Sequence, residues 1–253
     1  MAFERAKIKE VLEKVYLIDD AGESTCYVIC GQEKAMLIDT ANGMEDLHAI
    51  VRTLTDLPLI VVNTHGHCDH IYGNAYFDEA FLHPADLPLA AEHFAMFQAD
   101  YDQRGLTACP FRDIAIGQVF DLGGITLEVV PLQGHTAGSI GLIAREDRIL
   151  FSGDGVNTHL WMQLDESLPI AALQQMLLEL KAQHGHQFDR VLTGHAKDFR
   201  DASIVDMLLA GCQRLLSGQR SADQPYHYLG GECLQHPISD VPGEVIVYNE
   251  SKL

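Results

Sequence analysis

The stretch Thr64-His65-Gly66-His67-Cys68-Asp69-His70 is the most informative part of the chain, because it places three imidazoles and one carboxylate within six residues. It directly follows the apolar run at residues 59–62, so these groups are expected on a loop at the carboxyl end of a strand. Imidazole and carboxylate are ligands of zinc and similar divalent ions, whereas structural zinc sites favour cysteine. Only Cys68 occurs here, between two candidate ligands, and we expect it to point away. The stretch therefore predicts a metal centre.

Three further candidate ligands occur singly, each at the end of a strand-like segment and next to glycine. They are His135, Asp154 and His195. Glycine lets the backbone approach a site closely. Repeated after separate strands, this placement indicates that the three residues join the His-rich loop at one site. A second His-Gly-His triplet at residues 184–186 lacks the following Asp-His pair, and we expect it to be a solvated linker.

The rest of the chain alternates between strand-like and helix-like patterns. Strands are expected at residues 11–18, 25–29, 35–38, 59–62, 125–130, 140–144, 149–151, 190–192 and 245–248. Helices are expected at residues 45–54, 85–97, 170–183 and 204–216. Two batches of strands, each accompanied by helices, predict a layered α/β (α+β) protein with the helices outside.

The length of 253 residues fits one large domain, and we expect residues 1–253 to form it. Residues 98–116 lack a clear periodicity and contain Gly105 and Pro110, so they are expected to be a surface insertion that could fold over the site. Residues 217–253 are polar and rich in Gly and Pro, and are expected to form a short C-terminal extension.

The charge balance restricts the partners. The chain has 36 acidic and 17 basic residues and a formal net charge of −19. Binding to DNA or RNA relies on clustered Lys and Arg, so the sequence argues against a nucleic-acid partner. We also expect no membrane span, since no run of about 18 apolar residues occurs. A small molecule is the expected partner, and the oligomeric state is left open.

The N-terminus is charged and is not followed by an apolar run, so we expect no signal peptide. Six cysteines are too sparse for a disulfide scaffold and fit buried thiols in a reducing compartment. We therefore expect a cytoplasmic protein. The triplet Ser251-Lys252-Leu253 would indicate a peroxisome only if the source is eukaryotic.

Together these residues resemble the metallo-β-lactamase-fold hydrolases. The resemblance rests on Asp39, the His65-x-His67-x-Asp69-His70 cluster, His135, Asp154 and His195, in their order and approximate spacing through residues 25–200. It implies a four-layer αββα sandwich of two facing mixed sheets with helices on the outer surfaces. It also implies two divalent metal ions, for which Zn, Fe and Mn all suit such ligands and Zn is the first expectation.

The resemblance also implies a role for each matching residue. His65, His67 and His135 would hold the first metal ion, and Asp69, His70 and His195 would hold the second. Asp154 would bridge both ions, while Asp39 would orient a ligand imidazole, as metal-bound histidines generally require.

The implied activity is that of a metal-dependent hydrolase. A hydroxide bridging two metal ions would attack a small ester, thioester or lactone, with Asp69 and Asp154 as the catalytic carboxylates. The chain has no Gly-x-Ser-x-Gly motif that would supply a protein nucleophile. His159, Trp161 and Lys197 are candidates for the substrate pocket, the last through a substrate carboxylate.

Two alternatives stay open. A mononuclear iron dioxygenase that acts on glutathione persulfide resembles this chain across the same His/Asp cluster, but it uses fewer ligands. A non-catalytic binding role on the same fold would leave the ligands without a function. Within the family, Asp154 argues against β-lactam hydrolysis, because β-lactamases of this fold replace that residue with Cys or lack it.

Overall fold

The first sheet is formed by the N-terminal part of the chain. In the computed structural model, which describes residues 3–228 and 231–253, the strand order of this sheet is β1-β2-β3-β4-β5-β6-β7. The first four strands pair antiparallel and the last three join them in parallel. Their bounds are Ala6–Leu12, Val15–Asp20, Ser24–Cys30, Ala35–Ile38, Leu59–Val62, Ala80–Leu82 and Phe111–Asp113.

The second sheet faces the first and has the order β14-β13-β11-β10-β9-β8. Strands β8 to β11 form an antiparallel meander, and β13 then pairs parallel to β11. Along the chain, β8 to β11 cover Val119–Asp121, Thr126–Pro131, Ile140–Ala144 and Ile149–Gly153, and β13 and β14 cover Arg190–Thr193 and Arg200–Asp201.

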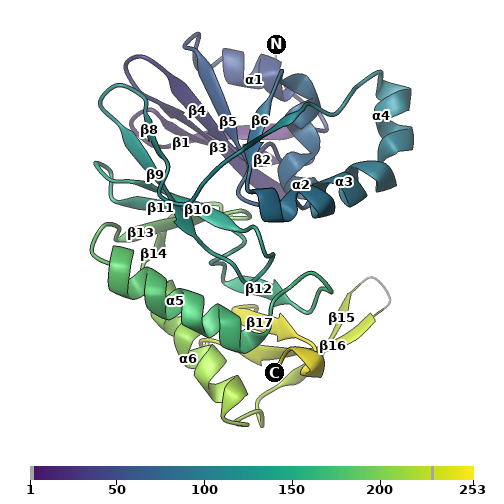
Figure 1. Cartoon of the computed structure of the whole chain (residues 1–253), viewed down its shortest axis with the longest axis vertical. Helices are drawn as coiled ribbons and strands as arrows, with labels where there is room; N and C mark the ends of the chain where they lie inside the picture. Colours follow the sequence, from purple (N-terminus) through teal and green to yellow (C-terminus); the bar gives the residue numbers. More distant parts are fainter. Residues whose placement is uncertain (1–2, 229–230) are drawn as a thin grey trace.

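The two sheets are sandwiched between helices, which gives four layers (Figure 1). Tyr27 of β3 packs against Phe151 of β11 in the core between the sheets, with ring centroids 5.3 Å apart. Helix α1 (Leu47–Arg52) covers the outer face of the first sheet. Helices α5 (Ile170–His184) and α6 (Ile204–Leu216) cover the outer face of the second. The fold is therefore the predicted αββα sandwich.

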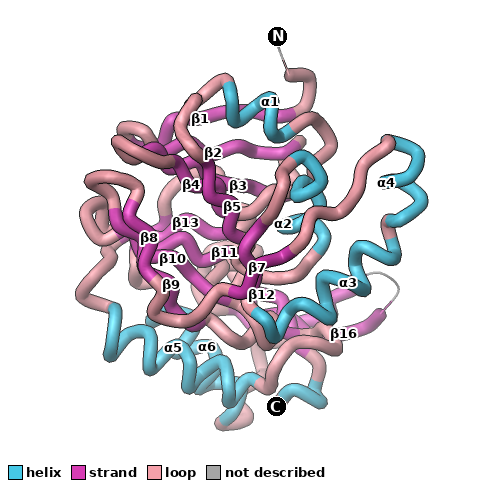
Figure 2. Tube along the Cα trace, turned by 45° about the horizontal axis from the view of Figure 1, so that its top comes forward, coloured by secondary structure: helices cyan, strands magenta, loops and turns pink. Residues whose placement is uncertain are grey.

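Short helices follow the strands of the first sheet. Helix α2 (Cys68–Ile71) begins inside the His-rich loop after β5, and a 3-10 helix at Tyr72–Tyr76 continues it. A second 3-10 turn at Pro84–Asp86 leads into α3 (Leu87–Met96) and then α4 (Gln98–Arg104). Helices α3 and α4 run along one flank of the molecule (Figure 2).

A third, smaller sheet has the order β12-β17-β16-β15 and packs against α5 and α6. Strand β12 (His159–Met162) pairs parallel to β17 (Val245–Tyr248). The hairpin β15 (Gln224–Tyr228) and β16 (Gly231–Pro237) completes the sheet, and the 3-10 helix Glu250–Lys252 follows β17. The predicted C-terminal extension thus contributes three strands to this sheet.

Two stretches differ from the sequence-based expectation. The strand predicted at residues 11–18 is a hairpin, because Lys14 adopts a left-handed φ of +61° and reverses the chain between β1 and β2. Residues 98–116 contain helix α4, whose end is set by Gly105 at φ +66°, and the edge strand β7. Tyr101 in α4 is buried and donates to the carbonyl of Tyr72 over 2.5 Å. This stretch is therefore packed against the body of the fold. In residues 3–228 and 231–253, no helix combines the length and apolar character needed to cross a membrane.

Candidate metal centre

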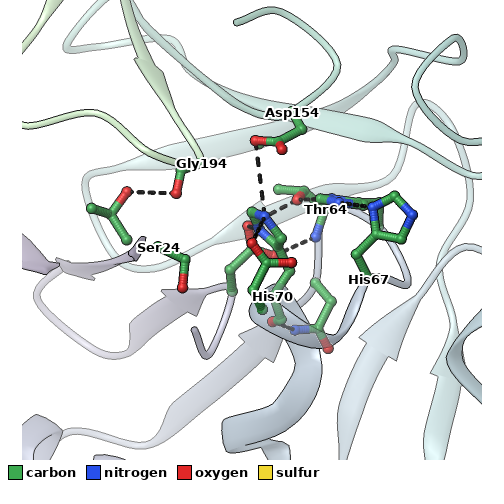
Figure 3. Close-up of polar contacts among 12 residues, drawn as sticks. Ser24, Thr64, His67, His70, Asp154 and Gly194 are labelled. Carbon is green, nitrogen blue, oxygen red and sulfur yellow. Dashed lines mark hydrogen bonds and ion pairs between the residues drawn. The ribbon is translucent and has the colours of Figure 1, made fainter. Parts of the chain in front are cut away.

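The candidate ligands meet at one edge of the sandwich, where loops from both sheets converge (Figure 3). The first sheet contributes the loop after β5, and the second contributes the loops that follow β9, β11 and β13. Because each ligand follows the carboxyl end of a strand, strand pairing brings the loops of the second sheet together, and the packing of the two sheets adds the loop after β5. All seven predicted ligands fall into compact groups here. We call His65, His67 and His135 the imidazole set, and Asp69, His70 and His195 the carboxylate set.

Three ring nitrogens converge in the imidazole set. The Nδ1 atom of His67 lies 3.1 Å from Nε2 of His65 and 2.9 Å from Nε2 of His135. Two nitrogens bound to one tetrahedral metal at 2.0–2.1 Å would be about 3.3 Å apart, so the spacing fits a shared ion.

Hydrogen bonds at the opposite ring positions fix which nitrogens lack a proton. Nδ1 of His65 faces Thr64 Oγ1 at 3.1 Å, and Nδ1 of His135 donates to the carbonyl of Trp161 over 2.7 Å. Nε2 of His67 donates to Glu166 Oε1 over 2.7 Å. The three converging nitrogens are therefore left with bare lone pairs that point at one another. With the rings in these tautomers, such an arrangement favours a cation bound between the three nitrogens.

The carboxylate set lies beside it. Nε2 of His195 is 3.6 Å from Oδ2 of Asp69, and Nε2 of His70 is 3.5 Å from the same oxygen. His70 is fully buried, yet its Nε2 has no hydrogen-bond partner among the described residues. A buried, unpaired ring nitrogen directed at carboxylates is what a metal ligand requires.

Asp154 lies between the two sets. Its carboxylate is 3.1 Å from Nε2 of His195, 3.9 Å from Nε2 of His70 and 3.8 Å from Nε2 of His135. A Cβ atom at Gly194 would come within 2.4 Å of Asp154 Oδ1, which explains why glycine precedes His195. The position fits a carboxylate shared by two ions.

Asp39 contacts the ring of His70 from the side opposite Asp69. It follows β4 with a left-handed φ of +59°, a strained conformation for a residue with a side chain. Its buried carboxylate accepts hydrogen bonds from Nδ1 of His70 (2.9 Å), the amide of Thr64 (2.7 Å) and Oγ1 of Thr64 (2.8 Å). One side chain thus fixes both the ring of His70 and the start of the His-rich loop.

Several other supports of the site carry no signal in the sequence. Glu166 and the carbonyls of Trp161 and Glu23 accept from ligand imidazoles; the Glu23 carbonyl lies 2.6 Å from Nδ1 of His195. Buried Asp86 accepts from the Gly66 amide (2.9 Å) and the Gly138 amide (2.6 Å), so it ties two ligand loops together. None of these residues belongs to a recognisable motif, and backbone acceptors are invisible in a sequence.

The two sets differ in charge. Burial, with the neighbouring imidazoles, lowers the pKa of His65 well below its usual range, and burial lowers the pKa of His135 to about 4. For His70, burial also acts to lower the pKa, but nearby carboxylates outweigh it and raise the pKa to about 9. Asp154 in the same way raises the pKa of His195 to about 10 against the effect of burial. Two rings of the imidazole set, His65 and His135, are therefore neutral, and the carboxylate set attracts positive charge.

The three predicted pocket residues lie at different places. Trp161 is half-buried and packs against Tyr228, with ring centroids 4.2 Å apart and the rings tilted by 55°. His159 is turned away, since its ring nitrogens face the carbonyl of Gly243 and the hydroxyl of Tyr226. Lys197 is 71% exposed and lies 3.9 Å from Asp19. Their role in substrate binding stays a prediction.

An αββα sandwich with a His/Asp cluster at the edge of its two sheets defines the class of protein. Residues 19–198 match the model of the metallo-beta-lactamase superfamily, and the chain belongs to this family.

Relatives with named activities are hydrolases. The chain is 28% identical over 218 residues to "Acyl-coenzyme A thioesterase MBLAC2" of Gallus gallus, covering 75% of this chain and 77% of that protein. It is 32% identical over 151 residues to "Hydroxyacylglutathione hydrolase GloC" of Haemophilus influenzae, covering 53% of this chain and 67% of that protein. A solved metallo-beta-lactamase from Pontibacter korlensis has the same fold, with a TM-score of 0.63 at 20% identity over 83% of this chain and 99% of that chain.

Proposed function

We propose that this protein is a dinuclear metal hydrolase that cleaves small thioesters. The observation that carries the proposal is the convergence of unpaired ring nitrogens and carboxylates in two adjacent sets joined by Asp154. The three lone pairs of the imidazole set and the orphaned Nε2 of His70 favour bound cations in both sets. A metal ion in each set would favour a dinuclear hydrolase over a dioxygenase that uses a single iron.

His65, His67 and His135 would hold one ion, and Asp69, His70 and His195 would hold the other, with Asp154 shared. Two divalent ions, of which Zn is our first expectation, supply a water activated at neutral pH and a Lewis acid for a carbonyl oxygen. Their +4 charge would be reduced to +2 by Asp69 and Asp154. The bound site would then be locally positive within a chain of net charge −19.

The chain's own residues hold this site in place and control access to it. Hydrogen bonds from Asp39, Glu166 and the carbonyls of Trp161 and Glu23 keep each imidazole in one orientation, so little reorganisation is needed when substrate binds. Asp69 is the more exposed of the two site carboxylates, at 31% against 14% for Asp154. It therefore faces the side from which a substrate would approach.

The substrate class is inferred from the relatives. An acyl-coenzyme A thioesterase and a hydroxyacylglutathione hydrolase both have names that denote cleavage of an acyl group from a thiol carrier. A small anionic thioester fits a positive centre inside an acidic shell, because long-range repulsion acts most strongly on large polyanions. Trp161 is proposed as a wall of the acyl pocket and Lys197 as a contact for an anionic group. A cytoplasmic location remains our expectation.

A substrate panel tests the proposal. Purified protein is assayed with acyl-coenzyme A, acylglutathione, simple esters and lactones, with thiol release measured for the thioesters. We expect turnover of at least one thioester, its loss after dialysis against a chelator, and recovery with Zn²⁺. Activity only on lactones or simple esters would overturn the substrate class. Oxygen consumption with a persulfide and one iron per chain would overturn the hydrolase itself.

A further inference from the structure

The segment between β12 and α5 forms one side of the imidazole set. Trp161, in β12 just before the segment, accepts from Nδ1 of His135 through its carbonyl. Within the segment, Glu166 accepts from Nε2 of His67. Oγ of Ser167 donates to the carbonyl of His135 over 2.9 Å, and the amide of Leu168 donates to the carbonyl of Gly134 over 2.8 Å. We call residues 163–168 the support loop.

The support loop belongs to neither a helix nor a strand, and Pro169 follows it. Within it, the amide of Ser167 donates to the carbonyl of Leu164. The bonds to the carbonyls of His135 and Gly134 come from Ser167 and Leu168, which both lie after Glu166. Because Glu166 can orient His67 only if its backbone is held, a restraint that also acts before Glu166 would strengthen this orientation.

The residues after β17 supply it. Strand β17 runs parallel to β12, with Met162 opposite Tyr248, so the two chains leave the sheet side by side. Nδ2 of Asn249 donates to the carbonyl of Gln163 over 2.7 Å. Nζ of Lys252 donates to the carbonyls of Asp165 (3.1 Å) and Ser167 (2.6 Å). These two carbonyls flank Glu166 on both sides.

We propose that Lys252 is a positioning residue of the metal centre, which fixes the support loop so that Glu166 holds His67 in the orientation needed to bind metal. The ammonium group of Lys252 bridges the carbonyls on either side of Glu166 and so restrains the backbone between them. Its charge strengthens both hydrogen bonds. The lysine of the Ser251-Lys252-Leu253 triplet thus has a role within the fold. The inference rests on the proposed metal centre, but not on the thioester substrate.

A double-mutant cycle tests this role, with Zn²⁺ affinity of the metal-free protein as the readout. The variants are Lys252→Met, Glu166→Gln and the double variant, and Zn²⁺ is titrated in competition with a chromophoric chelator. Loss of a group that orients a metal ligand typically weakens binding about 10- to 100-fold, which we expect for Glu166→Gln. Lys252 contacts the support loop and not the imidazole itself, so for Lys252→Met we expect a smaller loss of Zn²⁺ affinity, about 3- to 10-fold.

The coupling between the two substitutions shows whether Lys252 acts through Glu166. If Lys252 acts through Glu166, Lys252→Met weakens Zn²⁺ binding in the wild-type background but changes it by less than about 2-fold beside Glu166→Gln. Lys252→Arg, which keeps the charge and the donors, should restore most of the affinity. Equal losses in both backgrounds, or no loss in either, would overturn the proposal.

Two controls separate this result from general damage. Lys181→Met removes an exposed lysine that pairs with Asp206 between α5 and α6, and it should leave Zn²⁺ affinity unchanged. Thermal unfolding of each metal-free variant reports folding independently. If the wild-type protein binds no Zn²⁺, the proposed metal centre itself fails; if it binds Zn²⁺ but cleaves no thioester, only the substrate class fails and the test of Lys252 still stands.

Discussion

The imidazole set and the carboxylate set differ in their side chains and in the parts of the chain that support them. The imidazole set consists of three rings supported by Trp161, Glu166 and, through the support loop, by Lys252. The carboxylate set contains Asp69 and is supported by Asp39 after β4 and by the carbonyl of Glu23 between β2 and β3. Asp154 is the carboxylate that lies close to both, 3.8 Å from His135 and 3.1 Å from His195. The two halves should therefore respond independently to substitutions in their supports, and together to the loss of Asp154.

Asp154→Ala should have the largest effect, because it removes the one ligand that the halves share. A metal ion contributes several kcal/mol to the stabilisation of developing charge, so we expect thioester hydrolysis to fall about 1000-fold. Metal content should fall from two ions to one or none. Thiol release and elemental analysis measure both. Asp206→Ala, on the exposed face of α6, is the control and should change neither.

Asp39→Asn should weaken mainly the carboxylate set, because Asp39 bonds directly to the ring of His70 and reaches His65 only through Thr64. The carboxylate accepts three hydrogen bonds, and an amide nitrogen in place of one oxygen would face a donor. We expect about 10- to 100-fold weaker binding of one ion and little change for the other. Two-step Zn²⁺ titration resolves this. If both ions were lost together, the independence of the halves would be refuted. Asp121→Asn at the exposed end of β8 serves as the matched control.

Thr25→Val probes the same half from the opposite side. Oγ1 of Thr25 donates to the carbonyl of Gly194 over 2.9 Å, next to His195, and this contact joins the first sheet to the second. A single hydrogen bond is worth about 0.5–1.5 kcal/mol, which corresponds to about 2- to 10-fold in affinity. We expect that loss for the ion of the carboxylate set. Unchanged affinity would show that the amide of Thr25, which also donates to this carbonyl, is sufficient.

Lys197→Ala should have the smallest effect. The side chain is 71% exposed and lies beside Asp19, and exposed ion pairs contribute little. Zn²⁺ affinity should not change, and KM for an anionic thioester should rise by no more than about 3-fold, in the range of an exposed pair. Steady-state kinetics with Lys34→Ala as the control measures this. A much larger rise in KM would show that Lys197 contributes more to substrate binding than an exposed ion pair does.

The candidate ligands could be predicted from the sequence because they follow apolar strand segments. Apolar segments such as β4, β17 and helix α6 have the bounds expected from their patterns, and each ligand follows such a segment. Hydrophobic periodicity reports burial, and burial defines the sheet whose edge collects the loops. Hence the fold and the grouping of the seven candidate ligands follow from local patterns, while their occupation by metal stays a prediction.

The supports of the site were not predictable in the same way. Glu166 and Lys252 are ordinary charged residues whose roles depend on the parallel pairing of β12 and β17, strands separated by more than 80 residues in the sequence. The hairpin β15–β16 was missed because its strands are polar and one contains Pro225. The turn at Lys14 was missed because a left-handed lysine carries no sequence signal.

The most direct test of the account is the number of metal ions per chain in protein that cleaves a thioester. Elemental analysis of the purified wild-type protein is combined with thioester turnover during stepwise removal and return of Zn²⁺. We expect two metal ions per chain, loss of thioester turnover as the ions are removed, and recovery of turnover as Zn²⁺ is returned. Full turnover by protein that holds one ion or none would contradict it.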